Sequence, residues 1–147
     1  FGDIDNDGDM DVAVTHLPYE RSRFALLENK TLSKGKALIL KLVGSHAQGV
    51  TSSGRFSSRD AIGARVRATL GDQLVFREII GGGSYLSASD LRVVLGVGDA
   101  EQIDQLEIFW PSGRVQNLGT VVLKGPVTAL LLVEGAALEN LKKHQLP

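Results

Sequence analysis

The segment between residues 64 and 80 limits the fold of this chain more than any other stretch. Polar side chains alternate there with apolar ones, namely Ala64, Val66, Ala68 and Leu70. A period of two indicates a β-strand with one buried side and one side that faces solvent. The turn signal Gly71-Asp72 follows, and a second apolar-rich segment covers residues 73–80. Two such segments joined by a two-residue turn predict an antiparallel hairpin.

Similar short segments recur along the rest of the chain. They cover residues 12–15, 24–29, 37–44, 91–98, 103–110, 114–118 and 127–133. With 17 Gly, 4 Pro and 5% aromatic residues, the composition favours short strands joined by turns over a helical bundle. We therefore predict an all-β fold, an antiparallel sandwich or partly open barrel of about seven strands. Near the C-terminal end, Leu138 and Leu141 are three positions apart, which predicts a short helix over residues 136–144.

Composition also excludes several classes of function. The chain has 147 residues, 43% of them hydrophobic, which suits one domain with a real core. Lys+Arg 16 against Asp+Glu 17 leaves a net charge of −1, so no basic field attracts nucleic acid. No apolar run approaches the roughly eighteen residues that span a bilayer. The absence of cysteine excludes disulfides, thiolate zinc sites and cysteine nucleophiles.

The first eleven residues carry the clearest chemical signal, because they place five aspartates at alternate positions: Asp3, Asp5, Asp7, Asp9 and Asp11. Like charges this close repel one another unless a cation compensates them. Alternate carboxylates, the Asp9 carbonyl and Gly8 at the sixth position match the first half of an EF-hand-type loop. The twelfth position is Val14 instead of a bidentate Glu, and a strand follows instead of a helix. We predict a Ca²⁺ site, and the alternative is a solvated acidic turn.

Four further residues are candidate ligand-binding positions. Arg59 and Asp60 place a guanidinium beside a carboxylate, which suits recognition of a sugar or a carboxylate, although such a pair more often anchors a loop. Ser84 and Tyr85 lie in a glycine-rich loop at residues 81–90. Tyr85 could stack on a sugar ring, and the alternative is that it anchors the loop by packing.

The sequence offers no set of residues with the spacing of a catalytic site. Ser84 has no credible base or orienting partner, and His16, His46 and His144 are far apart in the chain. We therefore expect that the chain is not an enzyme.

Residues 45–58 are rich in Ser and Gly without apolar periodicity, so they form either a mobile loop or a binding loop, and mobility is favoured.

The acidic loop resembles the FG-GAP or VCBS type of repeat. The repeat pattern Asp-x-Asp-x-Asp-Gly-x-x-Asp is met here by Asp3, Asp5, Asp7, Gly8 and Asp11. Such repeats recur as blades of a β-propeller, so the resemblance implies that residues 1–33 are a partial blade. A single blade fragment exposes unpaired strand edges, and we expect homo-oligomers that form through these edges.

The remainder of the chain resembles the ASPIC and UnbV family, because four motifs occur in the order seen there. They are Arg59-Asp60-Ala61-Ile62-Gly63-Ala64, Gly82-Gly83-Ser84-Tyr85-Leu86-Ser87, Leu95-Gly96-Val97-Gly98-Asp99-Ala100 and Trp110-Pro111-Ser112-Gly113-Arg114. That domain follows FG-GAP repeats in secreted proteins, including some similar to cartilage acidic protein. The resemblance implies a β domain over residues 34–135 and no catalytic residues. Residues 136–147 then form a separate tail, which the leucine spacing predicts to be helical.

Both resemblances predict a non-catalytic, calcium-binding module for binding or adhesion, in an extracellular or periplasmic protein. Its ligand would be a carbohydrate or an extracellular protein. The alternative is an accessory or structural domain of a larger secreted or biosynthetic enzyme. If a eukaryote secretes the chain, Asn29-Lys30-Thr31 is a glycosylation sequon.

Overall fold

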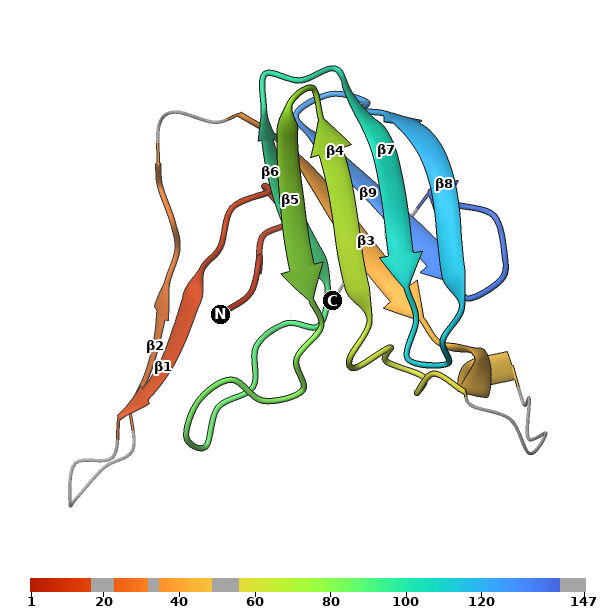
Figure 1. The fold of residues 1–147 in the computed structure, drawn as a ribbon. Coiled ribbons are helices and arrows are strands. Elements are labelled where there is room, and N and C mark those ends of the chain that lie inside the picture. The colour runs from red at the N-terminus through yellow and green to blue at the C-terminus, as the bar shows by residue number, and fades with distance from the viewer. Residues whose placement is uncertain (17–22, 32–34, 49–55, 141–147) are drawn as a thin grey trace.

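The computed structural model describes residues 1–16, 23–31, 35–48 and 56–140, and it contains two facing four-stranded sheets (Figure 1). One sheet has the order β10-β9-β3-β6, with β3 at Lys36–Val43, β6 at Val93–Gly98, β9 at Val127–Val133 and β10 at Glu139–Asn140. The other has the order β5-β4-β7-β8, with β4 at Arg65–Leu70, β5 at Gln73–Glu78, β7 at Gln102–Phe109 and β8 at Val115–Val122. The predicted all-β sandwich is confirmed, and the described strands form no closed barrel.

The core lies between the two sheets and takes alternate residues from the longer strands. The inward-facing residues of β3 and β4 are almost completely buried: Leu38, Leu40, Leu42, Val66 and Ala68. Trp110 directly follows β7 and is 3% exposed, and its indole N–H donates a hydrogen bond to Gln116 Oε1 at 3.0 Å. The hairpin of β4 and β5 forms as predicted, with Arg65 opposite Glu78 and Leu70 opposite Gln73.

β3 occupies the centre of its sheet and joins strands that are far away in the chain. It pairs antiparallel with β6 and parallel with β9. The parallel pair departs from a purely antiparallel sandwich. Parallel neighbours need a long crossover connection, and the strands from β4 to β8 supply it before the chain returns as β9.

The predicted helix over residues 136–144 is wrong in its described part. Residues 136–138 are not helical, and β10 pairs antiparallel with Leu130 and Leu131 of β9. β9 would otherwise be an edge strand with unpaired backbone groups, and Leu138 packs against the core. Strand pairing and burial therefore outweigh a weak helical spacing. Residues 141–147 lie outside the described residues.

Within the described ranges, no helix reaches the length and apolarity that crossing a membrane would need.

The Ser- and Gly-rich segment at residues 45–58 is fastened at both ends. It begins with a 3-10 helix, η1 at Ser45–Gln48. Glu134, at the end of β9, is 5% exposed and accepts hydrogen bonds from the Ser45 backbone N–H at 2.8 Å and from the Ser112 hydroxyl. The Ser112 backbone N–H donates to the hydroxyl of Ser57, which is fully buried, at 3.3 Å. The centre of the segment, residues 49–55, lies outside the described residues, so its mobility stays a prediction.

A two-stranded ribbon of β1 (Val12–His16) and β2 (Arg23–Leu27) forms a separate sheet beside the sandwich (Figure 1). Its strands are antiparallel, with Val12 opposite Leu27. Both faces carry exposed apolar side chains, among them Phe24 at 66% and Leu27 at 58% exposure. The assignment of residues 1–33 to a propeller blade stays a prediction.

Candidate metal centre

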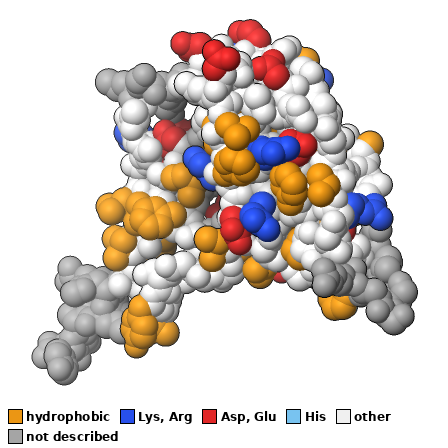
Figure 2. All heavy atoms as spheres, viewed as in Figure 1, with side chains coloured by type: hydrophobic (Ala, Val, Ile, Leu, Met, Phe, Trp, Pro, Cys, Tyr) orange, Lys and Arg blue, Asp and Glu red, His pale blue; other side chains and the backbone are white. Residues whose placement is uncertain are grey.

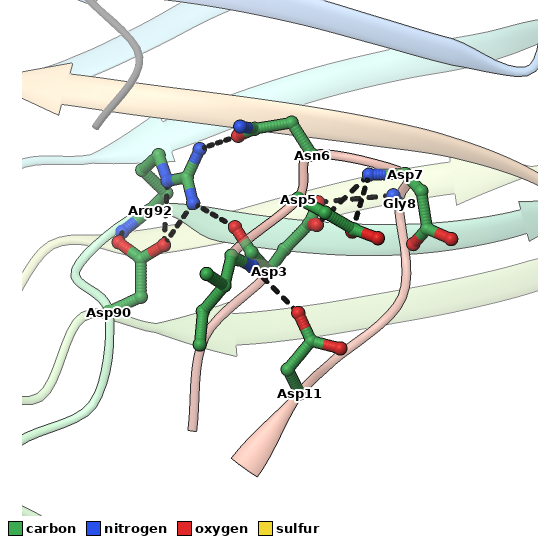
Figure 3. Close-up of polar contacts among 9 residues, drawn as sticks. Asp3, Asp5, Asn6, Asp7, Gly8, Asp11, Asp90 and Arg92 are labelled. Carbon is green, nitrogen blue, oxygen red and sulfur yellow. Dashed lines mark hydrogen bonds and ion pairs between the residues drawn. The ribbon is translucent and has the colours of Figure 1, made fainter. Parts of the chain in front are cut away.

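The acidic loop closes on itself between Gly2 and Asp11. The Asp11 N–H donates to the Gly2 carbonyl at 2.7 Å, and the Gly2 N–H donates to the Asp11 carbonyl at 3.2 Å. Within the loop, Asn6 has a φ of 62° and Gly8 a φ of 95°. These left-handed conformations suit Asn and Gly, and they turn the backbone sharply. The turned backbone brings Asp3, Asp5 and Asp11 near one another, whereas the Asn6 side chain points to Arg92 (Figure 3).

Three of the five predicted aspartates converge. One carboxylate oxygen from each of Asp3, Asp5 and Asp11 lies within 4.8 Å of the other two. This separation fits one Ca²⁺, because ligands about 2.3–2.6 Å from the ion on opposite sides lie about 4.6–5.2 Å apart. Asp7 and Asp9 are not in this group. The Asp7 carboxylate instead accepts a hydrogen bond from the Asp9 backbone N–H at 3.2 Å, which shapes the turn.

Asp3 is fully buried at the start of the loop. Its two carboxylate oxygens accept hydrogen bonds from the backbone N–H groups of Asp7 and Gly8, each at 3.1 Å. Burial raises the pKa of Asp3, although the hydrogen bond from Gly8 and the positive charge of Arg92 oppose this shift. The fold therefore places a carboxylate where its charge is poorly solvated.

Asp11 closes the loop and connects it to the ribbon. One carboxylate oxygen accepts a hydrogen bond from the Asn29 backbone N–H at 2.9 Å, and the other accepts one from the Ile4 N–H at 2.8 Å. These two hydrogen bonds lower the pKa of Asp11 against the effect of burial. Since Asn29 follows β2, the same carboxylate orients both the loop and the ribbon.

Arg92, just before β6, joins the acidic loop to the sandwich (Figure 3). Its side chain is 5% exposed and forms an ion pair with Asp90 at 2.5 Å. The guanidinium also donates hydrogen bonds to the Asp3 carbonyl at 2.6 Å and to the Asn6 side-chain oxygen at 2.5 Å. Sequence reasoning missed Arg92, because no local pattern marks a partner that is more than eighty positions away.

The loop also packs directly on the sheet that contains β3 and β9. A Cβ built on Gly8 would lie 2.8 Å from Ala37 Cβ and 3.1 Å from Val127 Cγ2. Ala37 is 4% exposed, and Ile39 on the same side of β3 is fully buried. Neither belongs to the core between the sheets. The acidic loop therefore covers part of the outer face of this sheet.

The other predicted site residues are exposed and lie in two loops: Arg59, Asp60, Ser84 and Tyr85. The loops meet at their bases, where the Gly63 N–H donates to the Ile79 carbonyl at 2.8 Å. No hydrogen bond or ion pair described for these ranges joins the four side chains to one another. Tyr85 is 88% exposed, so it does not act as a packed anchor of its loop.

The ASPIC and UnbV family matches residues 54–137, which is more than half of the chain. The matched range includes β4 to β9, Arg92 and the glycine-rich loop. It does not include β3, the strand that joins β6 to β9, or the acidic loop. No curated protein matches the chain, and the FG-GAP resemblance and the similarity to cartilage acidic protein stay predictions. On the matched range, the chain belongs to the ASPIC and UnbV family.

Proposed function

We propose that the chain is a non-catalytic, calcium-binding module in which Asp3, Asp5 and Asp11 supply carboxylate ligands to one Ca²⁺. The observation that carries this proposal is the convergence of their oxygens within 4.8 Å, two of the residues being buried. Asp7 lies outside this group and would join in a different side-chain conformation, and Asp9 would join through its backbone carbonyl, as the spacing of the loop suggests.

Electrostatics favour a hard divalent cation at this position. Several carboxylates in a short loop repel one another, and burial of Asp3 adds to the cost of its charge. A bound cation would remove both penalties. The ligands are all oxygens, which suits Ca²⁺ better than the softer metals that prefer sulfur and imidazole.

The larger role that we propose is binding or adhesion in an extracellular or periplasmic protein, with a carbohydrate or an extracellular protein as ligand. Tyr85 and Leu86 support this role, because they are 88% and 89% exposed at the tip of the glycine-rich loop. Binding to a glycan or protein array that is lost in Tyr85→Ala would support it. The alternative is an accessory or structural domain of a larger enzyme, and an array without any signal would favour that alternative.

Calcium binding is tested by isothermal titration of the chain with Ca²⁺ after treatment with a chelator. We expect one site with a dissociation constant of about 0.1–1 mM, as in extracellular calcium modules. Asp5→Asn is the most informative variant, because Asp5 is exposed and its loss disturbs the fold least. We expect it to weaken Ca²⁺ binding by about tenfold or more, since the site loses one of few charged ligands.

Asp72→Asn is the matched control, since Asp72 lies exposed in the turn between β4 and β5. This variant should bind Ca²⁺ as the wild type does. The proposal fails if the wild type gives no binding heat with Ca²⁺. It also fails if Asp5→Asn and the wild type bind the ion equally well.

A further inference from the structure

The outer face of the sheet β5-β4-β7-β8 carries an unusual mixture of side chains for a surface that faces solvent. The residues on β4 that point away from the core are Arg65, Arg67 and Thr69, and their cross-strand partners on β5 are Glu78, Phe76 and Leu74. Phe76 is 55% and Leu74 is 54% exposed. Figure 2 shows hydrophobic, basic and acidic side chains gathered on this face. Aromatic residues and arginines side by side are typical of protein interfaces.

In the middle of this face, Arg67 already has partners on β7. Arg67 Nε donates to Glu107 Oε2 of β7 at 2.6 Å, and the Arg67 guanidinium lies 5.2 Å from the centre of the Phe109 ring. Arg65 and Glu78 are different. They are direct cross-strand partners and both are exposed, yet no ion pair between them is found among the described residues. The face therefore offers one cation and one anion for an outside partner.

The charge balance of the face indicates what kind of partner fits. Two arginines, Arg65 and Arg67, stand against two glutamates, Glu78 and Glu107. A neutral face of this kind does not select a strongly anionic or cationic ligand. It does match itself, because a two-fold contact lets each cation of one copy meet the corresponding anion of the other.

We propose that a second copy of this chain docks on this face, with a two-fold axis that runs along the strands between β4 and β5. Each copy's β4 then lies over the β5 of the other. Arg65 faces the second copy's Glu78, which gives two equivalent ion pairs per dimer. Arg67 faces the second copy's Phe76, and Thr69 faces its Leu74. The arrangement follows from the cross-strand pairs. An axis that runs between β4 and β5 places each β4 residue of one copy over the cross-strand partner of that residue in the other copy.

Sedimentation of the full chain between about 1 µM and 1 mM tests the proposal, because weak homodimers dissociate within this range. Variants that reverse or exchange the charges of Arg65 and Glu78 show whether the dimer uses the proposed contact. We expect the wild type to dimerise with rising concentration. Arg65→Glu and Glu78→Arg should each weaken the dimer at least about tenfold, because each variant sets like charges against each other twice. The double variant, which exchanges the two charges, should restore the wild-type dissociation constant to within about threefold, because opposite charges meet again.

Arg77→Glu is the matched control, because Arg77 is on β5 but is the partner of the inward-facing Val66. It should leave the dimer unchanged, and fluorescence of Trp110 should confirm that every variant is folded. A wild type that stays monomeric over the whole range overturns the proposal, as does a double variant that fails to restore the dimer. Loss of the dimer on Phe24→Ser, with Arg65→Glu dimerising normally, would place the contact on the ribbon β1–β2 and would also overturn it.

Discussion

Glu134 shows how a single buried carboxylate can fix distant parts of this chain. It is 5% exposed and accepts hydrogen bonds from Ser45, 89 positions away, and from Ser112. Burial opposes its ionisation, but the hydrogen bonds from Ser112, Ser45 and Ser57 prevail and lower the pKa of Glu134 below its ordinary value of 4.5. The ionised carboxylate of Glu134 therefore holds the two ends of the segment at residues 45–58.

Glu134→Gln should lower the free energy of unfolding by about 1–3 kcal/mol near neutral pH, because one buried N–H loses a charged acceptor. Since the folded pKa is lowered, the stability that the carboxylate contributes is present above pH 4.5 and is lost as the pH falls below it. Urea unfolding near neutral pH and at about pH 3 measures the free energy of unfolding of the variant and of the wild type. The difference between these two free energies should be smaller at about pH 3 than at neutral pH. Glu101→Gln, on an exposed side chain, should change little. A difference that grows in acid would contradict this role.

At the scale of elements, two glycine substitutions test whether the acidic loop packs on the sheet. Gly8 and Gly113 have nearly the same φ, 95° and 93°, but only Gly8 has neighbours where a Cβ would go. Gly113→Ala should cost about 1–2 kcal/mol for the left-handed backbone alone. Gly8→Ala should cost about 1–3 kcal/mol more, because the new methyl group would overlap Ala37 and Val127. If urea unfolding gave the two variants the same loss of free energy of unfolding, the loop would not pack against Ala37 and Val127.

The elements that sequence could predict are those whose signals are local. The alternation at residues 64–70 and the turn Gly71-Asp72 define the hairpin β4–β5, and the spacing of the aspartates defines a loop that brings three carboxylates together. The parallel pairing of β3 with β9 could not be read in the same way, because it joins residues about ninety positions apart. The helix predicted over residues 136–144 is wrong in its described part because the strand form of β10 depends on the open edge of β9, which no local pattern reveals.

At the scale of the whole molecule, the acidic loop and the family domain form one unit. Arg92 holds the Asp3 carbonyl and the Asn6 side chain, Gly8 packs on the sheet, and the Asp90 N–H donates to the Phe1 carbonyl at 2.8 Å. None of these contacts leaves a local pattern in the sequence. They imply that a cation bound in the loop would stabilise the sandwich as well as the loop.

The most direct test follows the thermal unfolding of the sandwich through Trp110, the one tryptophan of the chain, with Ca²⁺ or with a chelator. Millimolar Ca²⁺ at a dissociation constant of about 0.1–1 mM adds about 0.4–1.4 kcal/mol to the free energy of unfolding. We expect one transition that moves up by about 1–5 °C in Ca²⁺, and by at most about 1 °C in Asp5→Asn, because a site that is tenfold weaker gains no more than about 0.4 kcal/mol from millimolar Ca²⁺. The same Trp110 melting temperature in Ca²⁺ and in chelator would contradict a calcium site that is coupled to this fold.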